Sequence, residues 1–213
     1  MVDGLELERQ PLGRADPPHP LVPLPRAFFE RDALVLARAL IGTRLVVRHE
    51  DQIRVARIVE TEAYRGPKDL ACHARAGVTR RTRTLYGPPG HAYVFLIYGM
   101  YDCFNVVCFG EGKGHAVLVR AVEPISGLPD GAGTDGPGRL TRALGITRRD
   151  DAIDLVAGDR IFLAARDRRP KIGVTPRVGV AYAGVWADKP WRFFDAGSRF
   201  VSRPPARMIG RGR

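Results

Sequence analysis

Two glutamates and a tyrosine occupy every second position of one β-rich segment. They are Glu60, Glu62 and Tyr64, in the stretch IVETEAY at 58–64. Because strand side chains alternate between two faces, these three share a face, and the carboxylates lie roughly 7 Å apart. Paired carboxylates at this spacing can activate water for a hydrolysis. A strand whose polar face lies in solvent has the same pattern, and the segment alone leaves both interpretations open.

Large apolar side chains gather at a predicted turn between two apolar β runs, residues 92–97 and 103–109. Tyr98, Met100 and Tyr101 fall at this turn, where side chains are exposed unless another loop covers them. Exposed aromatic side chains in a basic protein are candidates for stacking on bases or wedging into a duplex. A hairpin tip packed beneath a loop is the alternative.

The segment 66–90 is rich in Gly, Pro and Arg and is predicted to be a functional loop. It carries four arginines without a nearby acid: Arg75, Arg80, Arg81 and Arg83. They fit a phosphate clamp about as well as a solvated surface. His73 lies in the same loop, and a lone histidine is more often structural than catalytic. No histidine or cysteine has metal-ligand spacing, so the sequence predicts no metal site and no cofactor.

Composition indicates a folded protein with an anionic partner. The chain has 213 residues, of which 45% are hydrophobic, and a formal net charge of +11. Nearly all of its basic residues are arginines, which suit phosphate, although GC-rich codons also favour arginine. No apolar run approaches the ~20 residues of a membrane span, and no signal peptide is recognised. We therefore expect a cytoplasmic monomer without membrane contact.

Hydrophobic periodicity and turn residues predict an α+β fold. Helices are predicted at 32–41 and from Pro137 to Gly145. Strands are predicted at 45–47, 53–63, 92–97, 103–109, 116–122, 161–165 and 178–183. We expect one domain with a mixed, largely antiparallel curved sheet, flanking helices and a protruding hairpin. Its expected limits are 26–203, between a Pro-rich disordered or extended tail at 1–25 and a basic tail at 204–213.

Several long motifs together resemble one known family. They are ARIVETEAYRGPKDLACHAR at 56–75, GPPGHAYVFLIYGMYDCFNVV at 87–107, VLVRAVEP at 117–124, GPGRLTRALGI at 136–146, RVGVAYAG at 177–184 and WADKPWRF at 186–193. Their order and content resemble the 3-methyladenine (alkyladenine) DNA glycosylase family from about Phe28 to Ser202. The resemblance implies an enzyme that flips an alkylated or deaminated purine out of duplex DNA. It hydrolyses the N-glycosidic bond and leaves free base and an abasic site.

The resemblance also assigns roles to residues at the reacting bond. In the family, the second glutamate of ETEAY is the general base that activates water, which corresponds to Glu62. The arginine of the VLVRAVEP motif helps to hold that water, which corresponds to Arg120. A backbone carbonyl of the RVGV motif does the same, which corresponds to Val178.

Further positions are implied for the flipped base and for the duplex. The base pocket corresponds to Tyr64, His73, Phe95 and Asn105. Phe95 is often tyrosine in the family, so stacking is kept while a hydroxyl is lost, and the asparagine limits which purines fit. Tyr98 is implied to fill the gap left in the duplex, with Met100 and Tyr101 beside it, while Arg81 and Arg83 are expected on the phosphates.

Two other functions stay open at this point. A bifunctional glycosylase would also cut the strand through a lysine imine, and Lys68 is the only lysine near the motif. A non-catalytic nucleic-acid binder would keep the fold without the chemistry, and the presence of Glu62 and Arg120 argues against it.

Overall fold

The structure is a computed structural model that describes residues 20–203. The predicted C-terminal tail, 204–213, and most of the predicted N-terminal tail, 1–19, lie outside the described residues. Residues 20–25 run beside strand β6 (Ile161–Ala164), where the Leu24 N–H donates to the Leu163 carbonyl over 2.8 Å.

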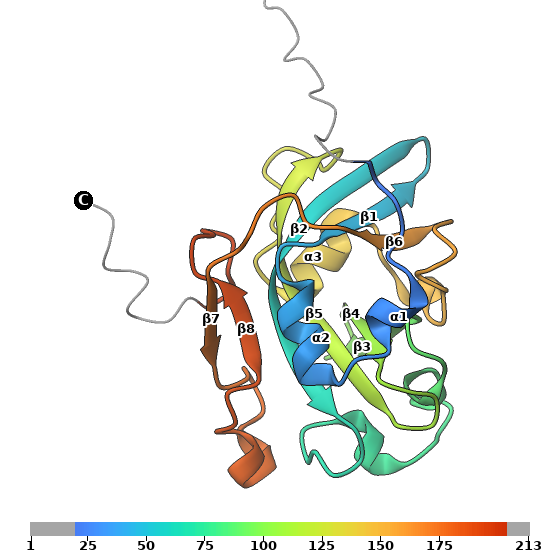
Figure 1. The fold of residues 1–213 in the computed structure, drawn as a ribbon, viewed down its shortest axis with the longest axis vertical. Coiled ribbons are helices and arrows are strands. Elements are labelled where there is room, and N and C mark those ends of the chain that lie inside the picture. Colours follow the sequence, from blue (N-terminus) through green and yellow to red (C-terminus); the bar gives the residue numbers. More distant parts are fainter. Residues whose placement is uncertain (1–19, 204–213) are drawn as a thin grey trace, which may run out of the picture.

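A curled sheet organises the chain (Figure 1), and every strand pairing among the described residues is antiparallel. Its main path runs in the order β3-β4-β5-β2-β1-β6, and β8 joins β7 to β2. The remaining strands are β1 (Arg44–His49), β2 (Gln52–Arg65), β3 (Ala92–Ile97), β4 (Tyr101–Cys108), β5 (His115–Ser126), β7 (Ile172–Thr175) and β8 (Arg192–Asp195). The predicted α+β class and curved antiparallel sheet are confirmed.

Strand β2 is the centre of this arrangement. One edge pairs with β5 along most of its length, while the other pairs first with β1 and then with β8 at Glu60–Glu62. The register between β2 and β5 shifts on both sides of Glu60, and Arg120 has no Cα partner between Val119 and Ala121. Such bulges bend a strand and re-aim its side chains. Here the irregularity lies at Glu60, the first of the three residues on this strand face that are candidates for the chemistry.

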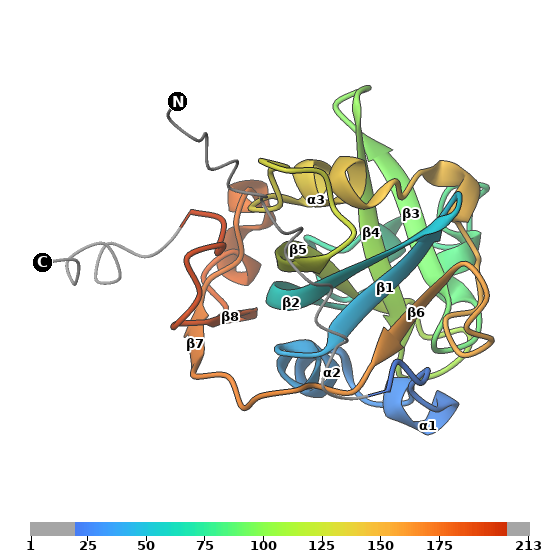
Figure 2. The same ribbon diagram turned by 90° about the horizontal axis from the view of Figure 1, so that it is seen from above.

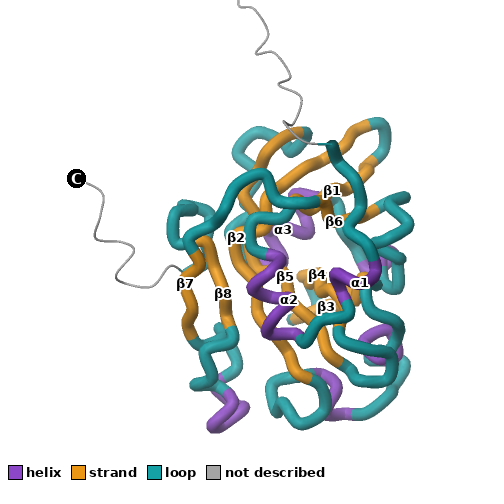
Figure 3. The backbone as a smooth tube through the Cα atoms, in the orientation of Figure 1, coloured by secondary structure: helices purple, strands orange, loops and turns teal. Residues whose placement is uncertain are grey.

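Short helices cover the sheet, as the purple segments of Figure 3 show. Helix α2 (Ala33–Leu40) begins where the Asp32 side chain accepts from the Leu34 N–H, a standard N-cap. It packs on the face of β2 opposite the glutamates. Thr61, which lies between them and points to that face, donates its hydroxyl to the Ala37 carbonyl over 2.9 Å. Figure 1 shows α2 lying across the strands, with the single turn α1 (Arg26–Phe29) beside it.

Helix α3 (Pro137–Leu144) lies against the start of β4, next to the turn of the hairpin formed by β3 and β4. Proline at its first turn and Gly145 at its end match the predicted helix. The Thr141 hydroxyl donates to the Asp102 carbonyl over 2.9 Å, and a Cβ added at Gly138 would lie only 2.6 Å from the Tyr101 ring. This close approach needs a glycine. Above it, the hairpin protrudes from the body of the molecule (Figure 2).

The predicted strand at 178–183 is wrong. Residues 177–180 form a bent loop that leads into the 3-10 helix η4 (Ala181–Trp186). Gly179 has a φ of +76°, and the Val178 N–H donates to the Glu62 carboxylate instead of to a neighbouring strand. The short strands β7 and β8 were not predicted, and neither were the 3-10 helices η1 (His73–Ala76), η2 (Arg83–Tyr86) and η3 (Arg148–Asp150).

Helix α2 offers a test of the core. Leu36 is fully buried, whereas its neighbour Val35 is 56% exposed. We expect Leu36→Ala to lower the free energy of unfolding by about 2–5 kcal/mol, because it leaves a cavity. Val35→Ala is the matched control and should change it by less than about 0.5 kcal/mol. Equal losses in urea unfolding would contradict the placement of this helix.

Candidate active site

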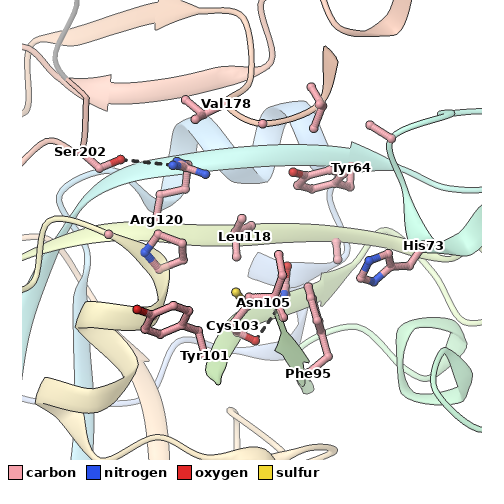
Figure 4. Close-up of a pocket in the computed structure, with 18 of the residues that line it drawn as sticks. Tyr64, His73, Phe95, Tyr101, Cys103, Asn105, Leu118, Arg120, Val178 and Ser202 are labelled. Carbon is pink, nitrogen blue, oxygen red and sulfur yellow. Dashed lines mark hydrogen bonds between the residues drawn. The ribbon is translucent and has the colours of Figure 1, made fainter. Parts of the chain in front are cut away.

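A cavity of about 610 Å³ opens between the central sheet, the hairpin and the loop before η4. It is lined by four residues that the sequence predicted for a base pocket: Tyr64, His73, Phe95 and Asn105. Arg120, Val178, Tyr98 and Tyr101 also line it. Figure 4 shows the rings of Tyr64, His73 and Phe95 around one space, with Arg120 and Val178 near Tyr64. The structure thus brings together segments that are far apart in the sequence.

Glu60 lies behind this cavity and has no exposed surface. Its Oε1 accepts from Arg120 Nε (2.9 Å), Arg192 Nε (2.6 Å) and the Ser202 hydroxyl (2.9 Å). Its Oε2 accepts from the Ser202 N–H over 2.6 Å. Four donors therefore reach this carboxylate, three on Oε1 and one on Oε2. The alternative of a solvated face is therefore wrong for Glu60.

Glu62 is also buried, but it is less fully bonded. Its Oε1 accepts from the Val178 N–H over 2.7 Å, and its Oε2 accepts from the Tyr64 hydroxyl over 2.9 Å. Arg120 Nη1 lies 3.4 Å from Oε1. Burial raises the pKa of the Glu62 carboxyl, against the opposing effects of Arg120, Val178 and Tyr64. Two hydrogen bonds leave Glu62 with lone pairs to spare, and all three neighbours line the cavity.

Tyr64 is held from behind by a buried ion pair that sequence reasoning missed. Arg177 lies 4.8 Å from the centre of the Tyr64 ring. Its guanidinium donates to both carboxylate oxygens of Asp69, at 2.6 and 2.9 Å, and both side chains are fully buried. Arg177 also donates to the carbonyls of Ala63 and Trp186. One face of Tyr64 is thus covered, and the other is left for the cavity.

The opposite wall is formed by the loop after β2 and by the hairpin. His73 lies 4.5 Å from Phe95, centre to centre, and its Nδ1 lies 3.1 Å from the Tyr93 hydroxyl. Burial and the nearby Arg81 lower the pKa of His73, so its ring is neutral at neutral pH. Burial raises the pKa of Tyr93 to about 12, so its hydroxyl keeps its proton. Asn105 donates to the carbonyls of Tyr93 and Cys103, which leaves its amide oxygen to face the cavity.

The rim carries the residues predicted to contact DNA. Tyr98 is 81% exposed and Met100 is 66% exposed, so the hairpin tip is not packed beneath a loop. Tyr98 has a φ of +52°, which is rare for a bulky residue. Arg81 and Arg83 are exposed, and the Arg81 guanidinium lies 5.4 Å from the Phe95 ring centre.

Comparison with known proteins agrees with this geometry. The sequence model of the methylpurine-DNA glycosylase family matches residues 27–199, which is most of the chain. The chain belongs to the methylpurine-DNA glycosylase family. As a member of this family it is a DNA glycosylase, and the resemblance found in the sequence motifs is confirmed.

Individual relatives of this glycosylase are similar over nearly their whole length. A protein of Myxococcus xanthus is 53% identical over 184 residues, which cover 85% of this chain and 94% of the relative. A protein of Legionella pneumophila (strain Corby) is 45% identical over 183 residues, which cover 84% of this chain and 98% of the relative. One of Methanocella arvoryzae is 46% identical over 192 residues, covering 84% and 96%. All three carry the provisional name 3-methyladenine DNA glycosylase.

Not every predicted site residue lines the cavity of this glycosylase. Glu62 lies just behind its wall, and Met100, Arg81 and Arg83 lie outside it. Sequence reasoning missed Asp69, Arg177, Arg192, Ser202 and Tyr93. Arg192 did carry a signal, since a charged residue between Trp191 and Phe193 interrupts an apolar run. Residues 20–203 hold no group of three or more His, Cys, Asp or Glu placed to bind a metal, and no helix there is long and apolar enough to cross a membrane.

The Asp69–Arg177 pair predicts a large stability effect. We expect Asp69→Ala to lower the free energy of unfolding by about 3–5 kcal/mol, because it leaves a buried guanidinium without its partner. The matched control is Asp154→Ala, which breaks a pair of equal length, 2.6 Å to Arg26, whose side chains are each 35% exposed. The control should lose only about 0–1 kcal/mol. Thermal or urea unfolding of both variants tests the difference, and similar losses would refute the buried placement.

Proposed function

We propose that this glycosylase flips a damaged purine out of duplex DNA and hydrolyses its N-glycosidic bond with water activated by Glu62. The supporting observation is the placement of Glu62. It is a buried carboxylate with unused lone pairs, and its hydrogen-bond partners form one wall of an aromatic-lined cavity. Glu60 is the weaker candidate for this base, because four donors already occupy its oxygens.

The reaction follows from this placement. Glu62 takes a proton from water, whose oxygen bonds to C1′ of the deoxyribose. The bond between C1′ and the base nitrogen breaks, and its electron pair leaves with the base. Arg120 and the Val178 carbonyl are the proposed further contacts of that water. An alkylated, cationic purine leaves as a neutral base and needs no added proton, which suits a site with one free carboxylate.

The proposed substrates are damaged purines such as 3-methyladenine, hypoxanthine and ethenoadenine. A flat base fits between Tyr64 on one side and His73 and Phe95 on the other, and stacking on aromatic rings is worth about 1–3 kcal/mol per base. Asn105 offers an acceptor to the edge of the base. The name 3-methyladenine DNA glycosylase of the relatives supports this class of substrate.

The hairpin tip is the proposed wedge. Extruding a nucleotide costs a few kcal/mol of stacking, and a side chain that fills the hole offsets part of this cost. Tyr98 lies on the cavity rim, is largely exposed, and is held in a left-handed conformation by the turn. The exposed arginines Arg81 and Arg83 are the proposed phosphate contacts beside it.

A bifunctional mechanism through a lysine imine has less support. Lys68 is exposed and does not line the cavity. Borohydride should therefore trap no covalent complex on damaged DNA. An assay that detects release of free base from such DNA would exclude the non-catalytic binder.

Glu62→Gln tests the general base. It keeps the size of the side chain but cannot accept the proton, so we expect excision to fall about 10²–10⁴-fold. Binding to lesion DNA should persist, as measured by gel shift beside single-turnover base release. Because Glu62 acts ionised and its pKa is raised above 4.5, wild-type excision should fall as pH drops through that raised pKa. Wild-type turnover by Glu62→Gln would reject the assignment.

Tyr98→Ala tests the wedge. Loss of one stacked aromatic should reduce excision from duplex DNA by an amount equivalent to about 1–3 kcal/mol. The melting temperature should barely change, because an exposed side chain contributes little to the core. Excision from single-stranded DNA carrying the same lesion is the control and should be nearly unaffected. A large fall in melting temperature with normal duplex excision would contradict the wedge.

A further inference from the structure

The arginine that faces Glu62 is not held by Glu62. Arg120 Nε donates to Glu60 over 2.9 Å, and its Nη2 donates to the Ser202 hydroxyl over 3.3 Å. Its Nη1 approaches Glu62 only to 3.4 Å. The guanidinium is therefore anchored on its far side and stops short of a close hydrogen bond with Glu62.

We propose that Glu60 is a positioning residue for base excision, which holds Arg120 beside Glu62 while preventing it from closing onto that carboxylate. The proposal rests on the proposed role of Glu62 as general base. Glu60 does not touch the reacting atoms. It acts through Arg120, which lies at the register irregularity between β2 and β5 and whose Nε bonds to Glu60 on the neighbouring strand.

The four hydrogen bonds to Glu60 explain how it can do this. Arg192 and the Ser202 hydroxyl donate to the same Glu60 oxygen as Arg120, the Ser202 N–H donates to the other oxygen, and Arg192 also donates to the Ser202 carbonyl. A carboxylate that accepts four hydrogen bonds, two of them from guanidinium groups, cannot turn without breaking several of these bonds at once. Glu60 is thus a rigid anchor, and the direction of Arg120 follows from it.

The charges around Glu62 give the anchor a second effect. The groups that face Glu62 are Glu60 and Tyr64 on β2, Arg120 on β5, Cys103 on β4, and Arg177 with the Val178 N–H in the loop before η4. Among these, Glu60 is the only carboxylate, and its negative charge opposes that of Arg120. Without it, Arg120 is free to bond Glu62 directly. That bond would occupy the lone pair needed for water and make Glu62 a weaker base.

Glu60→Gln separates this role from a purely structural one. The assay is single-turnover release of 3-methyladenine from methylated duplex DNA, because a cationic base leaves without protonation and the acid side of the pH profile then reports on Glu62. We expect a 10–100-fold lower maximal rate with unchanged DNA binding. The midpoint of the acid side should move to lower pH, because Glu62 has lost a negative neighbour. A wild-type midpoint in the folded variant would overturn the proposal.

Two further variants complete the test. Glu60→Asp keeps the charge but is too short to reach all four donors, so its rate should fall while its midpoint moves less than that of Glu60→Gln. A midpoint that shifts as far as that of Glu60→Gln would contradict the charge argument. Asp150→Asn removes a different buried carboxylate, which pairs with Arg160. It should lower the melting temperature and leave the pH profile unchanged, and a shifted profile would show that any buried charge has this effect.

If Glu60→Gln fails to fold, Ser202→Ala carries the test. It removes one donor to Glu60 and the acceptor of Arg120 Nη2, so the rate should fall 3–10-fold with normal DNA binding. A wild-type rate would overturn the proposal. A failure of the proposed function is distinguishable from a failure of this proposal. Only wild-type turnover by Glu62→Gln would show that Glu62 is not the general base.

Discussion

Four charged side chains meet beside the central sheet with almost no contact with water. Glu60 and Glu62 have no exposed surface, and Arg120 and Arg192 are 7% and 4% exposed. Burying any one of them alone would cost several kcal/mol, so each must remain paired and hydrogen-bonded. This requirement accounts for much of the local structure. Three features help to meet it: the register irregularity at Arg120, the pairing of β8 with β2, and the hydrogen bond from the Ser202 N–H to Glu60.

The same requirement gives two adjacent glutamates different chemistry. They lie two residues apart on one strand face, yet Glu60 accepts four hydrogen bonds and Glu62 accepts two. The raised pKa of Glu62 follows mainly from burial, while Arg120 keeps its charge because the two carboxylates outweigh the burial that opposes it and raise its pKa. Environment, and not residue type, separates a structural carboxylate from a candidate base.

Local sequence patterns predicted the elements with a clear period or cap. The helix after Asp32 and the strand through Glu62 are present, because apolar spacing and turn residues act over a few neighbours. Strands β7 and β8 have only four residues each, too few for a period to be recognised. The segment from Val178 to Ala183 looks like a strand by composition. Gly179 and the bond from the Val178 N–H to Glu62 bend it instead, and only the tertiary structure supplies that partner.

The site was predicted less completely than its motifs suggest. Alternation placed Glu60, Glu62 and Tyr64 on one face, and the family resemblance selected the cavity residues around them. Neither the alternation nor the resemblance could distinguish a buried ionic network from a solvated face, because a strand of either kind has charged residues at alternating positions. The partners that make the distinction, such as Arg192 and Arg177, lie more than a hundred residues away along the chain.

The bond between Glu60 and Ser202 joins positions 142 residues apart, which sets an order of events during synthesis on the ribosome. A growing chain exposes β2 and β5 long before residues 192–202 have been made. Until then Glu60 lacks three of its four donors, and Arg120 has no fixed direction. Contacts between such distant segments also form slowly. The network around Glu60 is therefore completed only after residues 192–202 have been made, so a nascent chain that stops before them carries the central strands without it.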